Sequence, residues 1–257
     1  MQHKLVTFIG GGNMAQAIVF SLLKRGYHAD KIIVCDPNEK KRVLFAPKGV
    51  RTTTDNVATA MQAGVVLLAV KPQMLVAVCV PLSAVDFQAK LVISIAAGIS
   101  LARLTALLPS AQSVVRVMPN TPALVGEGIA GLFAAKNTSE NDRTFAQDLL
   151  SAVGKTLWLD TEEQMHAVTA ASGSSPAYFF QLLEAMQQGL IHMGLNDQQA
   201  RELVQQAMLG AAKMVVENPQ LDLATLRQNV TSKGGTTAAA LDVFNQRQFN
   251  DIVQQAM

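Results

Sequence analysis

The sequence has little of what marks several common classes of protein. No apolar run approaches the ~18 residues that predict a membrane span, so we expect no membrane partner. Lysine and arginine are scattered and the net charge is only +2, which argues against nucleic acid as the main ligand. The 2 cysteines, Cys35 and Cys79, lie far apart in apolar segments. We therefore expect buried thiols in a reducing compartment, that is, a cytoplasmic protein.

Common catalytic and metal-binding patterns are also missing. The 4 histidines are His3, His28, His166 and His192, and none is paired at the spacing of metal ligands, so we predict no metal site. His166 follows Glu162 on an expected helix and is predicted to be a surface or packing residue. The chain has no G-x-S-x-G elbow and no activated-cysteine pattern. Its chemistry is therefore expected to reside in polar, glycine-rich loops.

The most informative segment is an apolar, β-rich run at residues 4–9 that ends in three glycines and passes at once into helical spacing. Gly10 would allow a tight turn, Gly12 would let a pyrophosphate approach the backbone, and Ala15 is small enough for close helix–strand packing. Free N–H groups at the helix start would bind the phosphates. A second apolar run ends in Asp36, about 20 residues further on, where an acid that binds ribose is expected. The segment predicts dinucleotide binding; the alternative is that the glycines serve only a tight turn.

Short apolar runs alternate with helical segments over the first part of the chain. The expected strands are residues 4–9, 31–35, 50–53, 65–70, 91–95, 114–118, 129–133 and 155–159. This alternation predicts an α/β fold, with a doubly wound, mainly parallel sheet of Rossmann type over residues 1–160. Ligands of such sheets bind outside the carboxyl ends of the strands, so the loops that follow the strands are expected to form the site.

No convincing strand follows Asp160, and residues 161–257 are predicted to form an all-helical domain. Ser175 and Pro176 look like the cap and first residue of one helix. Asn196 with Gln199 predicts the start of a long helix that reaches about Glu217.

Several short motifs occur in one order along the whole chain. They are Ile9–Met14, Ala69–Pro72, Ser94–Gly98, Arg116–Pro122, Ser172–Tyr178, Leu209–Met214 and Thr231–Thr237. In this order they resemble the pyrroline-5-carboxylate reductases, enzymes of the last step of proline biosynthesis. Two features depart from that family. Lys233 stands where its serine-proline-glycine-glycine loop has proline, and the chain ends soon after its final helix begins.

The resemblance implies a set of ligand contacts in each half of the chain. The implied cofactor residues are Gly10, Gly11, Gly12, Asn13, Met14, Asn56, Ala69, Val70, Lys71, Pro72, Ala96, Ala97, Gly98 and Asn229. The implied substrate residues are Val230, Thr231, Ser232, Gly235, Thr236 and Thr237, with Glu162 a weaker candidate. Purely structural roles stay open for some residues. Asn56 could be a helix cap, Lys71 and Pro72 could join a strand to a helix, and Arg116 could order a neighbouring loop.

The implied substrate is a cyclic imine that bears a carboxylate. Helix N-termini bind anions through free N–H groups, so the polar segments at 172–176 and 232–237 could hold the carboxylate without an arginine. An imine can be protonated before hydride attack, so no strong protein acid is needed. We expect Thr237 to hydrogen-bond the ring nitrogen, and catalysis otherwise to depend on positioning.

The choice between NADH and NADPH is left open by the residues around the second strand. The Asp36 carboxylate could accept hydrogen bonds from the ribose 2′-hydroxyl of NADH, and it would repel a 2′-phosphate. Lys40, Lys41 and Arg42 follow within two helical turns, and the family commonly uses NADPH. The balance favours NADH being usable, with NADPH retained as an alternative.

Two other functions and one assembly are also considered. A 3-hydroxyacid-type dehydrogenase would place a catalytic lysine on the helix that follows its substrate glycines, and residues 176–192 contain no lysine. A non-catalytic nucleotide sensor would keep the glycine loop without the chemistry.

The apolar helical faces of residues 203–215 exceed what a domain of this size buries. The resemblance implies an interlocked homodimer, with assembly into a larger ring left open.

Overall fold

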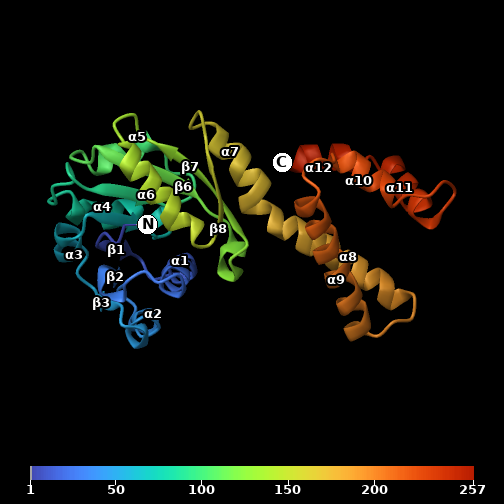
Figure 1. Ribbon diagram of the computed structural model, residues 1–257, viewed down its shortest axis with the longest axis horizontal. Helices are drawn as coiled ribbons and strands as arrows, with labels where there is room; N and C mark the ends of the chain where they lie inside the picture. Colours follow the sequence, from blue (N-terminus) through green and yellow to red (C-terminus); the bar gives the residue numbers. More distant parts are fainter. Residues whose placement is uncertain (1) are drawn as a thin grey trace. The chain divides into compact units, whose positions relative to one another are not determined.

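The computed structural model describes residues 2–257, which divide into two compact units. The first unit ends at Pro176 and contains the sheet, and the second, Ala177–Met257, contains helices only (Figure 1). The functional division expected at residues 160 and 161 lies between the last strand and the helices that follow it, and stays a prediction. None of the helices described is long and apolar enough to cross a membrane.

The first unit is built on one sheet with the order β3-β2-β1-β4-β5-β6-β7-β8. Its strands are β1 (Val6–Ile9), β2 (Ile32–Cys35), β3 (Arg51–Thr53), β4 (Val65–Leu68), β5 (Leu91–Ser94), β6 (Ser113–Met118), β7 (Gly128–Ala134) and β8 (Gly154–Trp158). All neighbouring strands are parallel except β6 and β7, which are antiparallel. The predicted doubly wound, mainly parallel sheet is therefore confirmed.

Helices connect the strands of this unit. They are α1 (Asn13–Lys24), α2 (Glu39–Arg42), α3 (Asn56–Gln62), α4 (Leu75–Leu82), α5 (Leu101–Leu107), α6 (Glu140–Ser151) and α7 (Gln164–Val168). Short 3-10 turns are η1 (Ala29–Lys31), η2 (Ala46–Lys48), η3 (Pro72–Met74) and η4 (Thr121–Val125). Side-chain caps begin several helices: Asp55 accepts from the Ala58 N–H, and Ser100 and Ser139 cap α5 and α6.

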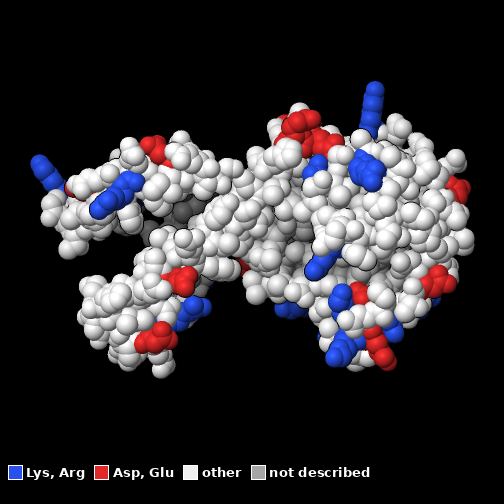
Figure 2. All heavy atoms as spheres, turned by 180° about the vertical axis from the view of Figure 1, so that it is seen from behind, with Lys and Arg blue, Asp and Glu red and all other residues white. Residues whose placement is uncertain are grey.

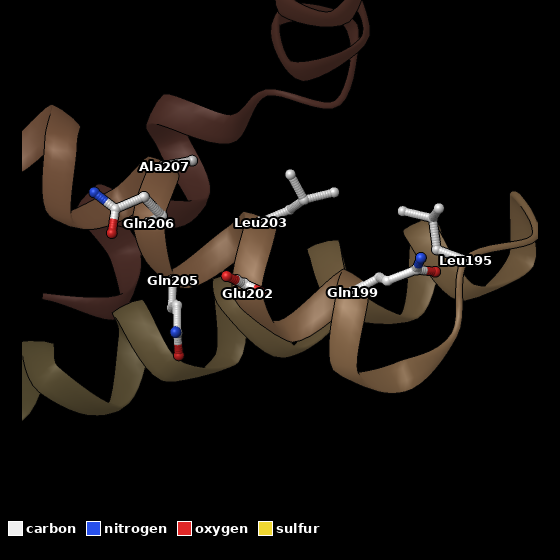
Figure 3. Close-up of a pocket in the computed structure, with 7 residues that line it drawn as sticks. All are labelled: Leu195, Gln199, Glu202, Leu203, Gln205, Gln206 and Ala207. Atoms are coloured by element: carbon white, nitrogen blue, oxygen red, sulfur yellow. The ribbon is translucent and has the colours of Figure 1, made fainter.

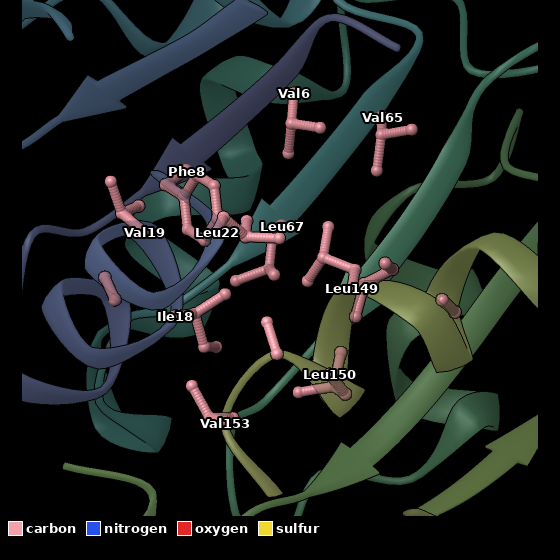
Figure 4. Packing of buried hydrophobic residues seen from close by; sticks show 14 of the residues in the cluster. Val6, Phe8, Ile18, Val19, Leu22, Val65, Leu67, Leu149, Leu150 and Val153 are labelled. Atoms are coloured by element: carbon pink, nitrogen blue, oxygen red, sulfur yellow. The ribbon is translucent and has the colours of Figure 1, made fainter. Parts of the chain in front are cut away.

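The central strands β1, β2, β4 and β5 are buried on both faces because helices cover both sides of the sheet. Val6 and Phe8 of β1 point to one face and pack with residues of α1 and α6 (Figure 4). Ile9 points to the other face, in a cluster that includes Leu75 of α4 and Leu104 of α5. This explains why the central strands read as continuous apolar runs rather than as alternating ones. Full burial of each such side chain contributes roughly 1.5–3 kcal/mol.

The second unit consists of helices joined by short loops. They are α8 (Ser175–His192), which begins two residues before the unit does, α9 (Asp197–Glu217), α10 (Leu223–Asn229), α11 (Thr236–Gln246) and α12 (Phe249–Ala256). The predicted capping of α9 is confirmed, since Asn196 and Gln199 form a reciprocal capping box. The short helix α10, of two turns, is not predicted by the sequence.

The predicted helix that opens at Ser175 and Pro176 is confirmed as α8, but the expected free start, capped by Ser175, is wrong. A π-helical segment, η5 (Thr169–Ser174), joins α7 directly to α8. Pro176 has no N–H to donate to the carbonyl of Ser172, four residues earlier, as an α-helix requires. The side-chain amide of Asn120 donates to that carbonyl instead, at 3.2 Å. The helical run therefore continues through a serine, glycine and proline sequence that locally resembles a helix start.

The helices of the second unit bury very little of their own apolar surface. Within residues 177–257, Ala200 and Val204 are the buried side chains. Large apolar side chains remain exposed on α8, α9, α11 and α12, among them Phe179, Phe180, Met186, Leu203, Met214, Phe244 and Ile252. Figure 3 shows one hollow on α9, lined by Leu195, Gln199, Glu202, Leu203, Gln205, Gln206 and Ala207. These faces lack the cover that the sheet of the first unit receives from its helices.

We predict that Gly154→Ala destabilises the protein strongly. Gly154 has a φ of +150°, and an added Cβ would overlap the backbone of Gly128 on the neighbouring strand β7. The free energy of unfolding should fall by about 3 kcal/mol or more, measured in urea at fixed protein concentration. Gly64→Ala is the control, because Gly64 is exposed and its Cβ would meet no atom within 4 Å. An equal, small effect of both changes would contradict this account of the β7–β8 pair.

Candidate functional site

The carboxyl ends of the central strands lie level with one another. Ile9 of β1 pairs with Cys35 of β2 and with Leu68 of β4, and Leu68 pairs with Ser94 of β5. The N–H of Gly10 donates to the Cys35 carbonyl at 2.7 Å, and the N–H of Ala69 donates to the Ile9 carbonyl at 2.8 Å. The loops after β1, β2, β4 and β5 therefore begin side by side at one edge of the sheet. The strand order reverses between β1 and β4, where ligands of such sheets bind.

The glycine loop after β1 contains one glycine that the fold requires and one that it does not. Gly10 has a φ of +107°, and its Cβ would lie 2.6 Å from the Ala69 carbonyl oxygen. Gly12 has an ordinary φ of −71°, and its Cβ would meet nothing within 4 Å. Gly12 is also the N-cap of α1, and no side chain caps this helix. An open space before free helical N–H groups fits a phosphate of a dinucleotide.

Asp36 directly follows β2 with its carboxylate turned inward, and the residue is 4% exposed. One carboxylate oxygen accepts from the Gly11 N–H at 2.9 Å and from the Lys41 ammonium at 3.1 Å. The other accepts from the Asn38 N–H at 2.9 Å. Burial by itself would raise the pKa of this carboxyl, but the three donors outweigh burial and hold the pKa below its ordinary value.

The basic residues of α2 partly organise the loop that precedes them. Lys41 binds Asp36, and the guanidinium of Arg42 donates to the carbonyls of Asp36 and Pro37 at 2.7 and 3.0 Å. Lys40 is exposed. These contacts of Lys41 and Arg42 were not predicted from the sequence, because a lysine-rich helix is usually only a solvated surface.

The other implied cofactor residues of the first unit lie at the same edge of the sheet or near it. Asn56 is the first residue of α3, and the helix is capped by the Asp55 side chain, so the alternative role of Asn56 as the cap is wrong. Lys71 is exposed and precedes η3, whose first residue is Pro72. Ala69 and Val70 are half-buried, Ala96 is buried, and Ala97 and Gly98 are exposed after β5.

Arg116 and Glu162 form an ion pair at 2.7 Å between β6 and the segment that precedes α7. The same Glu162 oxygen also accepts from the Leu101 N–H, at the start of α5, at 2.7 Å. The alternative in which Arg116 orders a neighbouring loop is therefore confirmed. Glu162 connects three elements of the first unit, and its weaker candidacy as a substrate residue stays a prediction.

The implied substrate loop lies in the second unit, between α10 and α11. Asn229 is the last residue of α10, and Val230 and Ser232 are exposed in the loop. The Thr231 hydroxyl donates to the Arg227 carbonyl at 2.6 Å.

The end of this loop leaves a helix start without a side-chain cap. Gly235 is the N-cap of α11 and no side chain caps it, so the first N–H groups of this helix are available beside exposed Thr236 and Thr237. Lys233, which stands where the family has proline, is also exposed. The helix α11 begins three residues later, at Thr236.

Residues with other chemical possibilities have ordinary surroundings. Cys35 and Cys79 are free and buried, as expected, and burial raises the pKa of both thiols, that of Cys79 to about 11. Both therefore stay neutral near pH 7 and are poor nucleophiles. His166 is exposed, which confirms it as a surface residue. Over residues 2–257, no three His, Cys, Asp or Glu side chains are grouped so that they could hold a metal ion.

Comparisons with known families divide the chain in a similar way. Residues 162–257 match the family model described as pyrroline-5-carboxylate reductase dimerisation. Residues 5–98 match one described as NADP oxidoreductase, coenzyme F420-dependent, a segment that contains the glycine loop, Asp36 and the loop after β4.

Individual proteins match over nearly the whole chain. A pyrroline-5-carboxylate reductase of Haemophilus influenzae is 71% identical over 257 residues, which are 100% of this chain and 95% of that protein. The solved structure of a Coxiella burnetii pyrroline-5-carboxylate reductase is 39% identical, with a TM-score of 0.92, covering 99% and 95% of the two chains. A Plasmodium falciparum pyrroline carboxylate reductase, solved with NADP bound, is 27% identical, with a TM-score of 0.88, covering 100% and 95%. The chain belongs to the pyrroline-5-carboxylate reductase family.

Proposed function

We propose that this chain reduces 1-pyrroline-5-carboxylate to proline with NADPH or NADH. The observation that carries this proposal is the family match over the full chain, from the glycine loop to the dimerisation half. A bound reduced nicotinamide supplies a hydride to the imine carbon, and a proton reaches the ring nitrogen, so that the C=N bond becomes a C–N single bond. The oxidised nucleotide and proline are the products.

The cofactor is assigned to the edge of the sheet at β1 and β4. The N–H groups at the start of α1 would bind the pyrophosphate, with Gly12 leaving room for it. Asn13, Met14, Asn56, Ala69–Pro72 and Ala96–Gly98 would complete its surroundings in the first unit. The role of Asn229, implied by the family resemblance, stays a prediction. Support for this assignment comes from the level strand ends and from the uncapped helix.

The substrate carboxylate is assigned to the N–H groups at the start of α11. These donors have no side-chain cap and lie beside the hydroxyls of Thr236 and Thr237. Val230, Thr231, Ser232 and Gly235 would shape this loop around the ring. Thr237 is assigned the hydrogen bond to the ring nitrogen, because an imine needs an oriented proton source rather than a strong acid.

We propose that the second unit forms a homodimer. Its exposed apolar residues, such as Phe180 at 66% and Leu203 at 54%, belong to the segment that matches the dimerisation family model. Exposed aromatic and aliphatic side chains of this number mark a protein–protein interface rather than a free surface. Assembly of dimers into a larger ring is a further part of the proposal.

The proposed location is the cytoplasm. Two free, buried thiols are consistent with a reducing compartment, because oxidising compartments favour disulfides.

The reaction is tested by following oxidation of NADPH and of NADH, separately, in the presence of pyrroline-5-carboxylate. We expect turnover with formation of proline, and no comparable turnover with 3-hydroxy or 2-hydroxy acids assayed in the reverse direction with oxidised cofactor. Purified protein that binds the cofactor but acts only on hydroxy acids would contradict the proposal. Cofactor binding without any turnover would favour a nucleotide sensor.

The role of Thr237 is tested by Thr237→Val, which keeps the shape and removes the hydroxyl. Loss of one hydrogen bond in the transition state, worth roughly 1–3 kcal/mol, should lower kcat/KM by about 5- to 150-fold. The dissociation constant of NADPH, measured in parallel, should hardly change. Normal turnover by Thr237→Val would remove this residue from the mechanism.

The dimer is tested by light scattering at micromolar concentration, on wild type and two variants. Phe180→Glu places a charge on the apolar face of α8 and should shift the mass towards a single chain, because an unpaired charge is costly to bury. Val80→Glu is the control, since Val80 is 63% exposed on α4 of the first unit. A fully active wild type with the mass of one chain would refute the dimer, and equal effects of both variants would refute this choice of interface.

A further inference from the structure

The Asp36 carboxylate has little capacity left for a ribose. Three donors already reach its two oxygens, two of them backbone N–H groups at 2.9 Å. The third donor, the Lys41 ammonium, belongs to a side chain that is 43% exposed, whereas the Asp36 side chain is only 5% exposed. Lys41 therefore lies between the carboxylate and solvent. An incoming ribose hydroxyl would have to displace it.

Asp36 also joins two segments that must lie correctly for a nucleotide to bind. Its contact with Gly11 holds the glycine loop, and its contact with Asn38 holds the loop that leads into α2. The Asn38 side chain then caps α2 by accepting from the Lys40 N–H at 2.9 Å. The same carboxylate thus sets the position of the glycine loop and of α2, the helix that carries Lys41.

The charge around this carboxylate favours an anion. Lys40, Lys41 and Arg42 outnumber the two acids Asp36 and Glu39. Figure 2 shows a group of basic side chains, with an acidic one among them, at the lower right of the molecule, where α2 lies when Figure 1 is turned round. An ammonium has three N–H donors, and Lys41 uses one of them on Asp36, so it can bind a second acceptor without leaving the first.

We infer that Lys41, held in place by Asp36, is the residue that recognises the 2′-phosphate of NADPH, and that Asp36 is a positioning residue for both cofactors. This rests on the proposed use of a nicotinamide dinucleotide. In this arrangement the carboxylate does not repel the phosphate, because Lys41 lies between the two and neutralises the acid. The acid at the end of β2, which sequence analysis associates with NADH, then serves NADPH as well.

The inference is tested by dissociation constants of NADPH and NADH for wild type and three variants, measured by quenching of Trp158 fluorescence or by calorimetry without substrate. Lys41→Met keeps most of the apolar stem and removes the charge. It should weaken the binding of NADPH by about 10-fold or more, as expected for loss of a charged hydrogen bond, and the binding of NADH by less than about 3-fold. Lys40→Met, the matched loss of charge one residue away, should change the ratio of the two constants by less than about 3-fold.

Asp36→Asn is expected to weaken both cofactors by a similar factor, about 5-fold or more, because the glycine loop loses an anchor common to both. If Asp36 instead bound the ribose, Asp36→Asn would weaken binding of NADH alone and leave binding of NADPH unchanged or improved.

Without cofactor, the positioning role of Asp36 can be measured through the pH dependence of stability. The pKa of Asp36 is lowered in the folded protein, so its carboxylate stabilises the fold above the unfolded pKa of about 4 and loses this effect as pH falls through the folded pKa. The stability advantage of wild type over Asp36→Asn should therefore be full near pH 7 and decline only below about pH 4.

The outcomes separate this inference from the proposed function. A wild type that binds neither nucleotide would overturn both. Binding of both with an unchanged NADPH to NADH ratio in Lys41→Met would overturn the inference alone, as would an equal effect of Lys40→Met. Lys41 is partly exposed, so this variant is expected to fold even if Asp36→Asn does not.

Discussion

The level ends of parallel strands are the constraint on which the cofactor site depends. Because β1 pairs in register with both β2 and β4, the chain leaves the sheet at the same height in each case. Three loops from distant parts of the sequence then meet, and the Asp36 carboxylate joins two of them by accepting from the Gly11 N–H. Both faces of these strands are buried by helices, so a slip in register would expose apolar side chains and is strongly disfavoured. The geometry of the site is thus maintained by the core.

Two glycines of the loop after β1 have different roles. Gly10 is needed for folding, since a side chain there would meet the Ala69 carbonyl. Gly12 is not required by any contact in the chain, and the space before it suits the phosphate that we assign to it. A similar division applies to the second half, where α11 starts without a side-chain cap and its apolar neighbours lack cover. In both places, we assign a feature that the isolated fold does not need to a ligand or to a partner chain.

The chemistry that we propose needs little from titratable side chains. An imine already carries a basic nitrogen, and its carboxylate can be held by backbone N–H groups. This agrees with a chain whose cysteines are buried with raised pKa values. The charged residues instead organise structure: Glu162 and Arg116 connect β6, α5 and the start of α7, and Asp36 connects the glycine loop to α2.

The sequence by itself determined the order of the strands, the glycine loop, the capping box of α9 and the family. These are local patterns, since side-chain periodicity, capping and turn residues act within a few positions of one another. The tertiary structure decided what depends on distant partners. The expected contact of Asp36 with a ribose stays a prediction, and the fold adds that the Gly11 N–H and the Lys41 ammonium donate to its carboxylate. Ser175 was expected to cap a free helix start, but Asn120 donates to the carbonyl that proline leaves free, and α8 follows η5 without a break. A residue's neighbours in sequence show which hydrogen bonds it can make, and only the fold decides which partner is within reach.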